Sequence, residues 1–371
     1  MNILHVITHG GWAGSESIAA SIANEQAKRG DNVSVILRRH QSFKEKDIVN
    51  KFSKKIDIYW VEQNETHPKT QVNRLIRDGN FVNCVLSIDI CHAHLPYGCQ
   101  LGSLLREHLS LYFEICVTMH VRYHPLYYLA DKIFTVAKWQ VQEVPNDFRG
   151  KVFTIENFLC NNEFSNEQRL SLFKKKYHIG GDSKYIVYIG RLDLVKGADI
   201  LVRAFNKLCQ TKYKLIIVGD GSECSSLKKI STENIIFAGK ILDASFVLDI
   251  ADICVVPSRF ESFGLVLLEA INAKCRIIAS DIPSFREILR NENYLFDNES
   301  VISLSEKISD YILWPLKGYV DPNIVNEYSL AAAMDKLECA YSVRSVNDNK
   351  RIELDVDKCL KLEDESCHVE I

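Results

Sequence analysis

The chain has 371 residues, of which 47% are apolar and 25% charged, a composition typical of an ordered globular protein. Because domains usually hold roughly 100–200 residues, this length predicts two domains. The formal net charge is −3, which excludes a general nucleic-acid binder, because such a protein needs a dominant basic surface. Charge is uneven along the chain: residues 1–178 hold 22 basic and 18 acidic side chains, a balance that suits an anionic acceptor or a membrane surface.

Cysteine usage and the N-terminus both bear on the compartment. The 12 cysteines form no CxxC pair, and several lie in apolar runs, which favours a reducing compartment over a disulfide scaffold. The N-terminus has neither a basic n-region nor a long apolar h-region, and no apolar stretch reaches 18 residues. We therefore expect a cytoplasmic protein, with peripheral association on the inner face of the cell membrane as the alternative.

In the first part of the chain, short apolar runs of strand length alternate with helix-length amphipathic stretches, as in a parallel sheet with crossover helices. A strand at Ile3–Thr8 is followed by a glycine-bearing loop over Gly10–Gly14 and by a helix over Ser15–Lys28. Further strands are predicted at residues 33–37, 56–61, 88–92, 115–119, 134–136 and 152–155. Residues 1–160 therefore predict one doubly wound, Rossmann-like α/β domain.

A second set of elements follows the polar stretch Asn157–Phe164, which we interpret as a linker. Strands are predicted at residues 185–189, 214–218, 235–238, 253–257 and 276–279, with helices near 197–209, 222–230, 244–250 and 264–273. Residues 161–326 thus predict a second Rossmann-like domain. A final helix is expected within 327–345, over Glu327–Tyr341, and the acidic tail 346–371 is expected to be loosely ordered.

The segment from Arg259 to Glu269 holds the densest chemical signal. A strand that ends at Pro257 runs into a polar loop and then into a helix that starts near Gly264, so backbone N–H groups of Gly264 and Leu265 are offered to an anion. Glu261 lies in the loop and Glu269 inside the helix, so they would meet different parts of one ligand. The alternatives are a helix cap for Glu261 and a solvated helix residue for Glu269.

Two further loops also follow strands. Gly190–Gly197 carries Arg191 and Lys196 between glycines, a pattern that suits a diphosphate, although surface cations in an ordinary loop would look the same. Gly219 begins a strand-to-helix turn that could admit a nucleotide base or be purely structural. Ligands of open α/β sheets bind outside the carboxyl ends of the strands, where all three loops are predicted to lie.

Together these motifs resemble the glycosyltransferase family 4 (group 1) enzymes of the GT-B fold. The resemblance runs to about residue 342 and also rests on segments of the first domain: the N-terminal glycine loop, Ile90–His94, Val117–His120 and Asn157. It implies two Rossmann-like domains facing each other across a cleft, the first for the acceptor and the second for the nucleotide-sugar donor. The linker departs from the family pattern, because Phe158 follows Asn157 where such enzymes commonly have glycine.

The resemblance also implies roles for individual residues. Arg191 and Lys196 would hold the donor diphosphate, Glu269 the ribose hydroxyls and Glu261 the transferred sugar. Phe263, Gly264 and Leu265 would contact phosphate and sugar through their backbone, and His120 would lie near the reacting centre. Gly11, Gly190 and Gly219 complete the expected nucleotide-sugar contacts. The candidate catalytic residues are therefore Glu261, His120, Arg191 and Lys196.

The expected reaction is transfer of a hexose-type sugar from a nucleotide diphosphate sugar to a cell-surface glycan or lipid-linked acceptor, as in lipopolysaccharide, O-antigen or capsule biosynthesis. A UDP-sugar is favoured over a GDP-sugar, and no further cofactor is expected. Cationic side chains aimed at the leaving diphosphate would stabilise its charge without a metal ion. The resemblance implies retention of anomeric configuration, with the acceptor attacking on the face that the leaving group departs from.

Other functions remain as alternatives. A nucleotide-sugar hydrolase or epimerase of the same fold would turn over donor without an acceptor, and a non-catalytic sugar-binding relic would turn over none. An NAD-dependent oxidoreductase is disfavoured, because Gly10–Gly14 is too compressed for the dinucleotide fingerprint and no acidic residue ends the second strand. The histidines His92, His94, His120 and His124 could form a transition-metal site, although packing, capping or a cleft contact would explain them as well.

Overall fold

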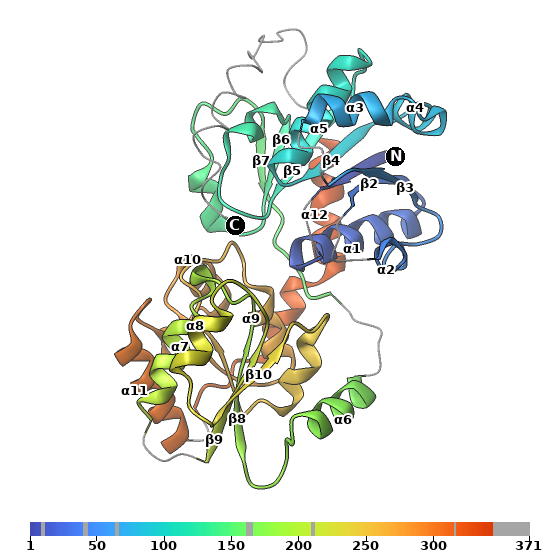
Figure 1. The fold of residues 1–371 in the computed structure, drawn as a ribbon. Coiled ribbons are helices and arrows are strands. Elements are labelled where there is room, and N and C mark those ends of the chain that lie inside the picture. Colours follow the sequence, from blue (N-terminus) through green and yellow to red (C-terminus); the bar gives the residue numbers. More distant parts are fainter. Residues whose placement is uncertain are drawn as a thin grey trace. The chain divides into compact units, whose positions relative to one another are not determined.

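The computed structural model describes residues 1–8, 12–39, 44–63, 67–160, 166–208, 212–314 and 317–343. The chain divides into two units: unit 1 comprises Met1–Glu156 with the residues from Ala333 onward, and unit 2 comprises Asn157–Ala332. Each unit is built around its own parallel sheet (Figure 1). The expectations for Gly11 and for the tail 346–371 lie outside the described residues.

Within the described residues, unit 1 holds a seven-stranded parallel sheet in the order β3-β2-β1-β4-β5-β6-β7. Its inner strands are mostly buried, as expected when helices cover both faces of a sheet, whereas the edge strands β3 and β7 are largely only partly buried. The chain winds outward from β1 in both directions, so the topological switch point lies between β1 and β4. The strands are β1 Asn2–Ile7, β2 Asn32–Arg38, β3 Asp57–Val61, β4 Ile90–His94, β5 Glu114–Met119, β6 Lys132–Thr135 and β7 Lys151–Thr154.

Helices cover both faces of this sheet (Figure 1). One core packs α1 and α2 against the sheet, and the other packs α3, α4 and α5 against it. The bounds are α1 Gly14–Arg29, α2 Glu45–Val49, α3 Pro68–Leu75, α4 Gly79–Val85 and α5 Pro96–His108, with 3₁₀ turns at Pro125–Leu129 and Lys138–Glu143. The short helices α2 to α4 escaped the sequence analysis because each has eight residues or fewer, a stretch too short for a helical period to stand out.

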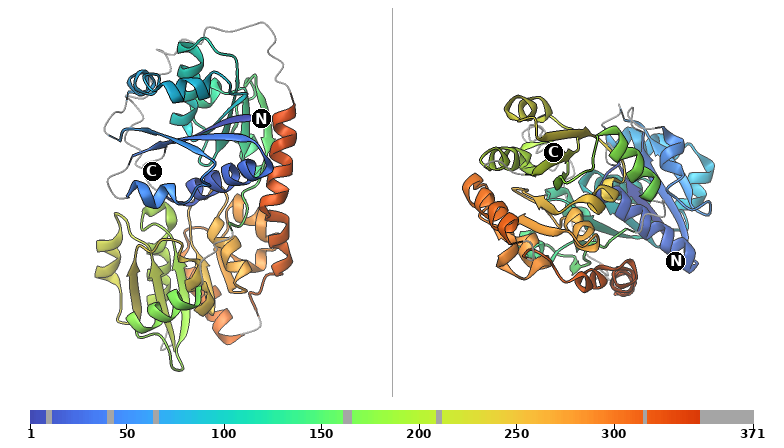
Figure 2. Two further views of the ribbon diagram at one scale, coloured as in Figure 1. Left: turned by 90° about the vertical axis from the view of Figure 1, so that its right-hand side faces the viewer. Right: turned by 90° about the horizontal axis from the view of Figure 1, so that it is seen from below.

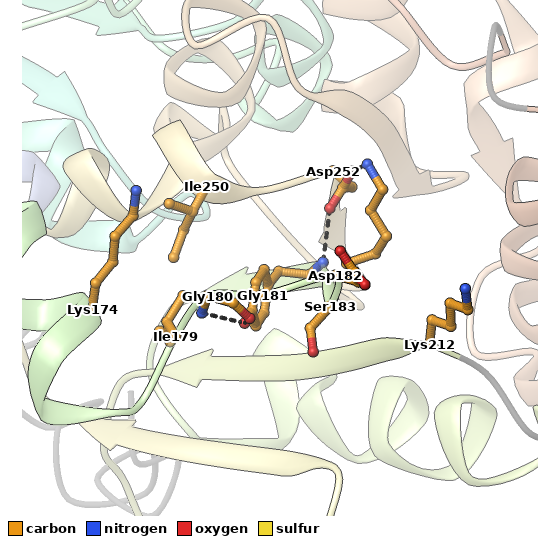
Figure 3. A pocket seen from close by; sticks show the side chains of 11 residues that line it. Lys174, Ile179, Gly180, Gly181, Asp182, Ser183, Lys212, Ile250 and Asp252 are labelled. Carbon is orange, nitrogen blue, oxygen red and sulfur yellow. Dashed lines mark hydrogen bonds and ion pairs between the residues drawn. The ribbon is translucent and has the colours of Figure 1, made fainter.

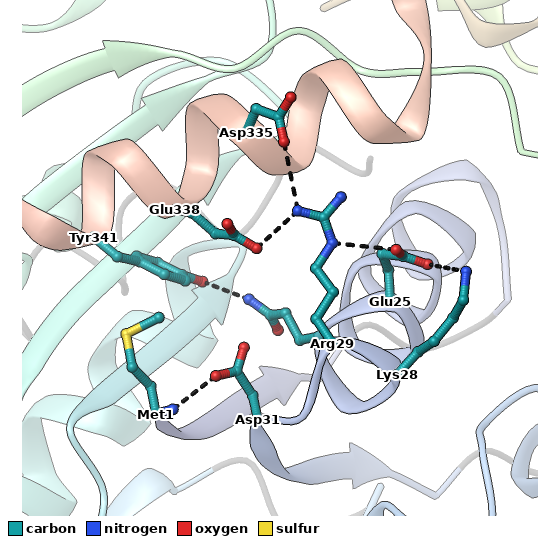
Figure 4. Close-up of polar contacts among 9 residues, drawn as sticks. Met1, Glu25, Lys28, Arg29, Asp31, Asp335, Glu338 and Tyr341 are labelled. Carbon is teal, nitrogen blue, oxygen red and sulfur yellow. Dashed lines mark hydrogen bonds and ion pairs between the residues drawn. The ribbon is translucent and has the colours of Figure 1, made fainter.

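Most of the last helix, α12 (Leu330–Ser342), belongs to unit 1. It runs alongside that unit in Figure 2, and Figure 4 shows how it is attached. Arg29 of α1 lies 2.9 Å from Glu338, and the buried ammonium of Lys132 donates to the carbonyl of Tyr341 at 3.1 Å. The helix begins three residues after the predicted Glu327, because Pro322–Tyr328 forms a 3₁₀ turn instead.

Unit 2 holds, within the described residues, a six-stranded parallel sheet in the order β10-β9-β8-β11-β12-β13. Here the switch point lies between β8 and β11, which pair through Ile186 and Ile253. The strands are β8 Lys184–Ile189, β9 Tyr213–Val218, β10 Ile235–Gly239, β11 Ile253–Val256, β12 Arg276–Ser280 and β13 Leu295–Phe296.

One face of this sheet forms a core with α7, α8 and α11, and α9 packs against β11 and β12. The helices are α6 Asn166–Lys176, α7 Ala198–Asn206, α8 Cys224–Ile230, α9 Leu265–Asn272, α10 Pro283–Leu289 and α11 Val301–Leu313. The helix expected at 244–250 is a 3₁₀ segment, Ala244–Ile250. Among the described residues, no helix is both long and apolar enough to cross a bilayer.

Candidate functional site

Three loops of unit 2 meet at the carboxyl edge of its sheet. They follow β8, β9 and β11, and backbone hydrogen bonds join them: Leu192 N–H donates to Asp220 O at 2.9 Å, and Arg259 N–H donates to Val195 O at 2.8 Å. Because β8 and β11 flank the switch point, this edge is where an open α/β sheet binds its ligand. The motifs around Arg191, Lys196 and Glu261 are thus brought together.

Two glycines allow the loops to approach so closely. A Cβ on Gly197 would lie 1.9 Å from the carbonyl oxygen of Pro257, and one on Gly219 would lie 1.8 Å from that of Gly190. Both residues also have positive φ, 67° and 150°, which side chains disfavour. These positions accept only glycine without backbone movement, so they fix the spacing between the loops.

Lys196 and Glu261 form the polar centre of this edge. The Lys196 Nζ lies 2.6 Å from Glu261 Oε1, and the same oxygen accepts a hydrogen bond from Ser258 Oγ at 3.2 Å. Their side chains are only 21% and 17% exposed, so solvent screens the pair poorly. The two residues are 65 positions apart, and the sequence analysis assigned them separate ligand contacts without expecting this ion pair.

Arg191 adds a second cation to the loop after β8. It is half-exposed and lies 3.2 Å from Asp193 Oδ2, while Asp193 also accepts from the N–H of Lys196 and so caps the turn Leu194–Lys196. The hydroxyl of the buried Tyr188 donates to the Arg191 carbonyl at 2.7 Å. The loop backbone is therefore braced, while the guanidinium remains accessible to a ligand.

The start of α9 provides neutral donors for an anion. Gly264 caps the helix in the left-handed conformation, with φ 104°, and packs against Phe285. Among the described residues, the N–H groups of Gly264 and Leu265 have no hydrogen-bond partner. The preceding Phe263 is buried, and the centroid of its ring lies 5.5 Å from that of Tyr328. These two unpaired N–H groups lie at a helix start, on the same edge of the sheet as Lys196, and can donate hydrogen bonds to phosphate oxygens.

Glu269, in the second turn of α9, is partly buried, and its carboxyl group makes no hydrogen bond or ion pair with a described residue. Desolvation, helped by the negative charge of Asp243, raises the pKa of its carboxyl to about 7. A buried carboxyl without a partner is an uncommon and costly arrangement. Donors from a ligand, such as a pair of hydroxyl groups, would lower that cost.

Arg259 is a supporting residue that the sequence analysis quoted but gave no role. Its guanidinium binds Asp199 of α7 through two hydrogen bonds of 2.8 and 3.0 Å and also reaches Glu299. The bidentate pair ties the loop after β11 to the helix after the Lys196 loop. A cation with two carboxylate partners is better placed to hold the loops than to bind a phosphate.

The predicted histidines lie in unit 1, near its own switch point. His5 of β1, His92 and His94 of β4, and His120 after β5 form one stacked array, in which neighbouring ring centroids lie 4.4 to 5.4 Å apart. His124 stands outside it and caps the 3₁₀ turn at Pro125, accepting from Leu126 N–H. His5 was not singled out by the sequence analysis, because a lone histidine inside an apolar strand gives no local signal.

Three of these histidines, His5, His92 and His94, carry ring nitrogens within 4.8 Å of one another, a spacing that could hold a metal ion. Each also has hydrogen bonds to protein groups: His5 to Gln26, His92 to Thr118 and Tyr341, and His94 to His5 and His120. Burial lowers the pKa of His5 to about 4, and it also lowers the pKa values of His92 and His94 well below the ordinary value for histidine. These three histidines are therefore neutral at physiological pH.

A cavity of about 660 Å³ lies at the opposite, amino edge of the unit 2 sheet (Figure 3). Lys184 and Asp252, which line it, are paired with each other at 2.9 Å, and Gly180 N–H donates to the Tyr185 hydroxyl. These residues precede or begin strands, whereas ligands of such sheets bind where strands end. The cavity is thus separate from the site around Lys196.

Residues 171–317 match the family model for "Glycosyl transferases group 1". Over this segment, the chain is similar to the group 1 glycosyltransferases. An uncharacterized glycosyltransferase from Methanocaldococcus jannaschii is 28% identical over 49% of this chain and 50% of its own length. An O-antigen biosynthesis glycosyltransferase from Escherichia coli is 26% identical over 37% of this chain and 40% of its own length. The matched segments therefore span half or less of these curated relatives.

Solved structures extend the likeness to both units. Anabaena HepE, solved with UDP and glucose, superposes with a TM-score of 0.74 at 16% identity, covering 92% of this chain and 99% of HepE. At this identity, the likeness establishes the fold alone. The chain has the GT-B fold of two Rossmann-like α/β sheets, as the sequence motifs of the family predicted.

Proposed function

We propose that the protein transfers a sugar from a nucleotide diphosphate sugar to an acceptor hydroxyl with retention of configuration. The observation that carries this proposal is the composition of one edge of the unit 2 sheet. Lys196 and Arg191 offer positive charge there, the start of α9 offers two unpaired N–H groups, and Glu269 offers an unpaired carboxyl. A diphosphate and a ribose diol have the complementary groups.

The leaving diphosphate is the group that this edge can stabilise. When the bond between the anomeric carbon and the diphosphate oxygen breaks, its electron pair stays on that oxygen, and Lys196, Arg191 and the N–H groups of Gly264 and Leu265 would bind the growing charge. The acceptor oxygen bonds to the anomeric carbon on the same face. Its proton passes to the departing phosphate oxygen, so that the transfer is balanced without a metal ion.

The ion pair between Lys196 and Glu261 suggests how the sugar would be held. An arriving diphosphate competes with Glu261 for the Lys196 ammonium, and the released carboxylate can then accept hydrogen bonds from sugar hydroxyls. Glu261 would thus contact the sugar only when the donor is bound. In this proposal Phe263 orients the loop through its packing on Tyr328, while Gly190 and Gly219 keep the neighbouring backbone close.

The donor and acceptor classes rest on the resemblance and the relatives. A UDP-sugar is proposed because HepE was solved with UDP, and a cell-surface glycan or lipid-linked acceptor because a relative acts in O-antigen biosynthesis. Unit 1 would bind the acceptor, with His120 near the reacting centre, at the inner face of the cell membrane. Lipopolysaccharide, O-antigen and capsule assembly all use acceptors of this class.

A thermal-shift panel with UDP, GDP, ADP and CMP tests the donor site, because a ligand that binds the folded state raises its stability. We expect UDP to give the largest shift, and Arg191→Ala and Lys196→Ala to reduce it. Lys184→Ala is the matched control, because Lys184 lies on the same sheet at the opposite edge. Equal losses in all three variants, or no shift with any nucleotide, would refute the assigned site.

The reaction itself is tested by following nucleotide release from the UDP-sugar with and without a lipid extract that contains acceptors. We expect release to depend on the extract and labelled sugar to appear in the lipid or glycan fraction. Release at the same rate without the extract would identify a hydrolase instead, and isomerised donor would identify an epimerase.

A further inference from the structure

A chain of hydrogen bonds runs through the buried core of unit 1 and ends at His120. The amide oxygen of Gln26 lies 2.7 Å from His5 Nε2, His5 Nδ1 lies 3.1 Å from His94 Nε2, and His94 Nδ1 lies 3.1 Å from His120 Nε2. Gln26 and His5 are completely buried, and His94 is 2% exposed. No water is needed to complete these contacts.

The direction of each hydrogen bond follows from the chemistry of its partners. A neutral imidazole has one N–H and one lone pair, and an amide oxygen can only accept. Facing the oxygen of Gln26, His5 must therefore carry its proton on Nε2, which makes its Nδ1 an acceptor for His94 Nε2–H. The same step repeats once more: His94 Nδ1 is the acceptor, and His120 donates its Nε2–H.

A second branch is compatible with this orientation of the Gln26 amide. Its nitrogen donates to the Tyr341 hydroxyl at 3.4 Å, and that hydroxyl lies 2.7 Å from His92 Nδ1. His92 then donates from Nε2 to Thr118 Oγ1 at 2.7 Å. With the amide nitrogen engaged by Tyr341 of α12, the amide oxygen faces His5. Tyr341 therefore belongs to the same hydrogen-bond network as the histidine array.

We propose that Gln26 is a positioning residue for His120: acting through His5 and His94, its amide oxygen holds the His120 imidazole as the Nε2–H tautomer, so that Nδ1 serves as a hydrogen-bond acceptor. The arrangement of protons stands by itself. Only the use of this tautomer in transfer rests on the proposed function. Burial keeps His5 and His94 neutral. Each therefore keeps one ring nitrogen as a hydrogen-bond acceptor, which the order of donors and acceptors requires.

The tautomers can be observed directly in the unliganded, full-length protein. Selective ¹⁵N-histidine labelling and long-range ¹H–¹⁵N correlation separate protonated ring nitrogens from those with a lone pair, and single His→Gln variants assign the signals. We expect His5, His94 and His120 all to show the proton on Nε2. A predominant Nδ1–H form at His5 or His94 would mean that the chain runs in the opposite direction and would overturn the inference.

Gln26→Met tests the origin of this order, because it keeps the length of the side chain and removes the oxygen. We expect His5 and His120 to become tautomer mixtures. The control is Asn24→Leu on the same helix, whose amide bonds Lys51 and Ser53 and touches none of the histidines, so their signals should not move. Wild-type tautomers in Gln26→Met would overturn the inference.

Gln26→Glu keeps an acceptor for His5 and guards against a variant that fails to fold. Since both carboxylate oxygens accept, we expect the His5, His94 and His120 signals to stay as in wild type, while Tyr341 now donates to the carboxylate and His92 changes tautomer. A changed His120 signal in a folded Gln26→Glu protein would contradict the mechanism.

Transfer assays separate this inference from the proposed function. We expect Gln26→Met to lower kcat about tenfold, the scale for losing the partner of a functional histidine, with the KM for the UDP-sugar unchanged and with Gln26→Glu near wild type. An active enzyme whose tautomers change in Gln26→Met without a loss of kcat would refute the role in transfer. If no transferase activity exists, the proposed function fails, and the NMR result still decides the tautomer assignment.

Discussion

Glu269 should bind the donor in its ionised form and should therefore release a proton when the donor binds. Without ligand its pKa is about 7, against an ordinary value of 4.5, because its carboxyl is desolvated and close to Asp243. Hydroxyl groups that donate to the carboxylate favour the charged form and lower this pKa. Near pH 6, where most Glu269 side chains are protonated, each bound donor should release close to one proton.

The same shift sets a pH dependence of folding stability. Because the folded-state pKa is raised, the folded protein holds a proton that the unfolded chain loses between about pH 4.5 and 7. The stabilisation that Glu269 contributes is complete below about pH 4.5, falls as the pH rises, and is lost above about pH 7. At 1.36 kcal/mol per pKa unit, the loss is roughly 3–4 kcal/mol. We expect Glu269→Gln to remove this pH dependence and to be the more stable protein at pH 8.

Calorimetry in two buffers with different ionisation enthalpies measures the proton released on binding. The intact UDP-sugar is the right ligand, because its two phosphates do not titrate between about pH 5 and 8. We expect wild-type affinity to rise with pH up to about 7 and then to level off. Glu269→Gln should release no proton, and its affinity should be weaker by roughly 1.5–3 kcal/mol at pH 8, the scale for hydrogen bonds to a charged group. Equal proton release in both proteins would refute this reasoning.

Four further predictions concern the same edge of the unit 2 sheet. Arg191→Ala and Lys196→Ala should each lower kcat about 10²–10³-fold at saturating donor, the loss expected for one stabiliser of developing charge, and near-normal turnover would contradict the leaving-group role. Activity should persist in EDTA, because side chains supply the positive charge; loss on chelation that Mg²⁺ or Mn²⁺ restores would argue for a metal. Glu261→Gln should slow transfer, and its effect should be non-additive with Lys196→Ala in a double-mutant cycle, because the two side chains are in contact. Gly197→Ala should lower the melting temperature and abolish the UDP thermal shift, since its Cβ would displace Pro257; an unchanged shift would show that the loops can separate.

Much of the proposed donor site could be predicted from the sequence because its signals are local. A strand, a glycine-bearing loop and a helix follow one another within about twenty residues. This local pattern is enough to place Gly264 and Leu265 at the start of a helix, where backbone N–H groups lack partners within the helix. The fold was predictable for the same reason, since alternation of strands and helices indicates a parallel sheet. The motif could not reveal that Lys196 contacts Glu261, which depends on the pairing of β8 with β11.

What only the tertiary structure decided is the state of the buried polar groups. The pKa of Glu269 follows from how much solvent the packed unit removes, a quantity that sequence spacing does not contain. Gln26 and Tyr341 are 315 positions apart, yet they meet beside His5 and His92 because α12 packs on unit 1. Each of these residues, taken alone, looks like an ordinary core or surface residue. Their chemistry depends on hydrogen bonds between segments that are distant in the sequence and that are buried against each other only in the folded protein. A sequence pattern therefore cannot reveal these hydrogen bonds.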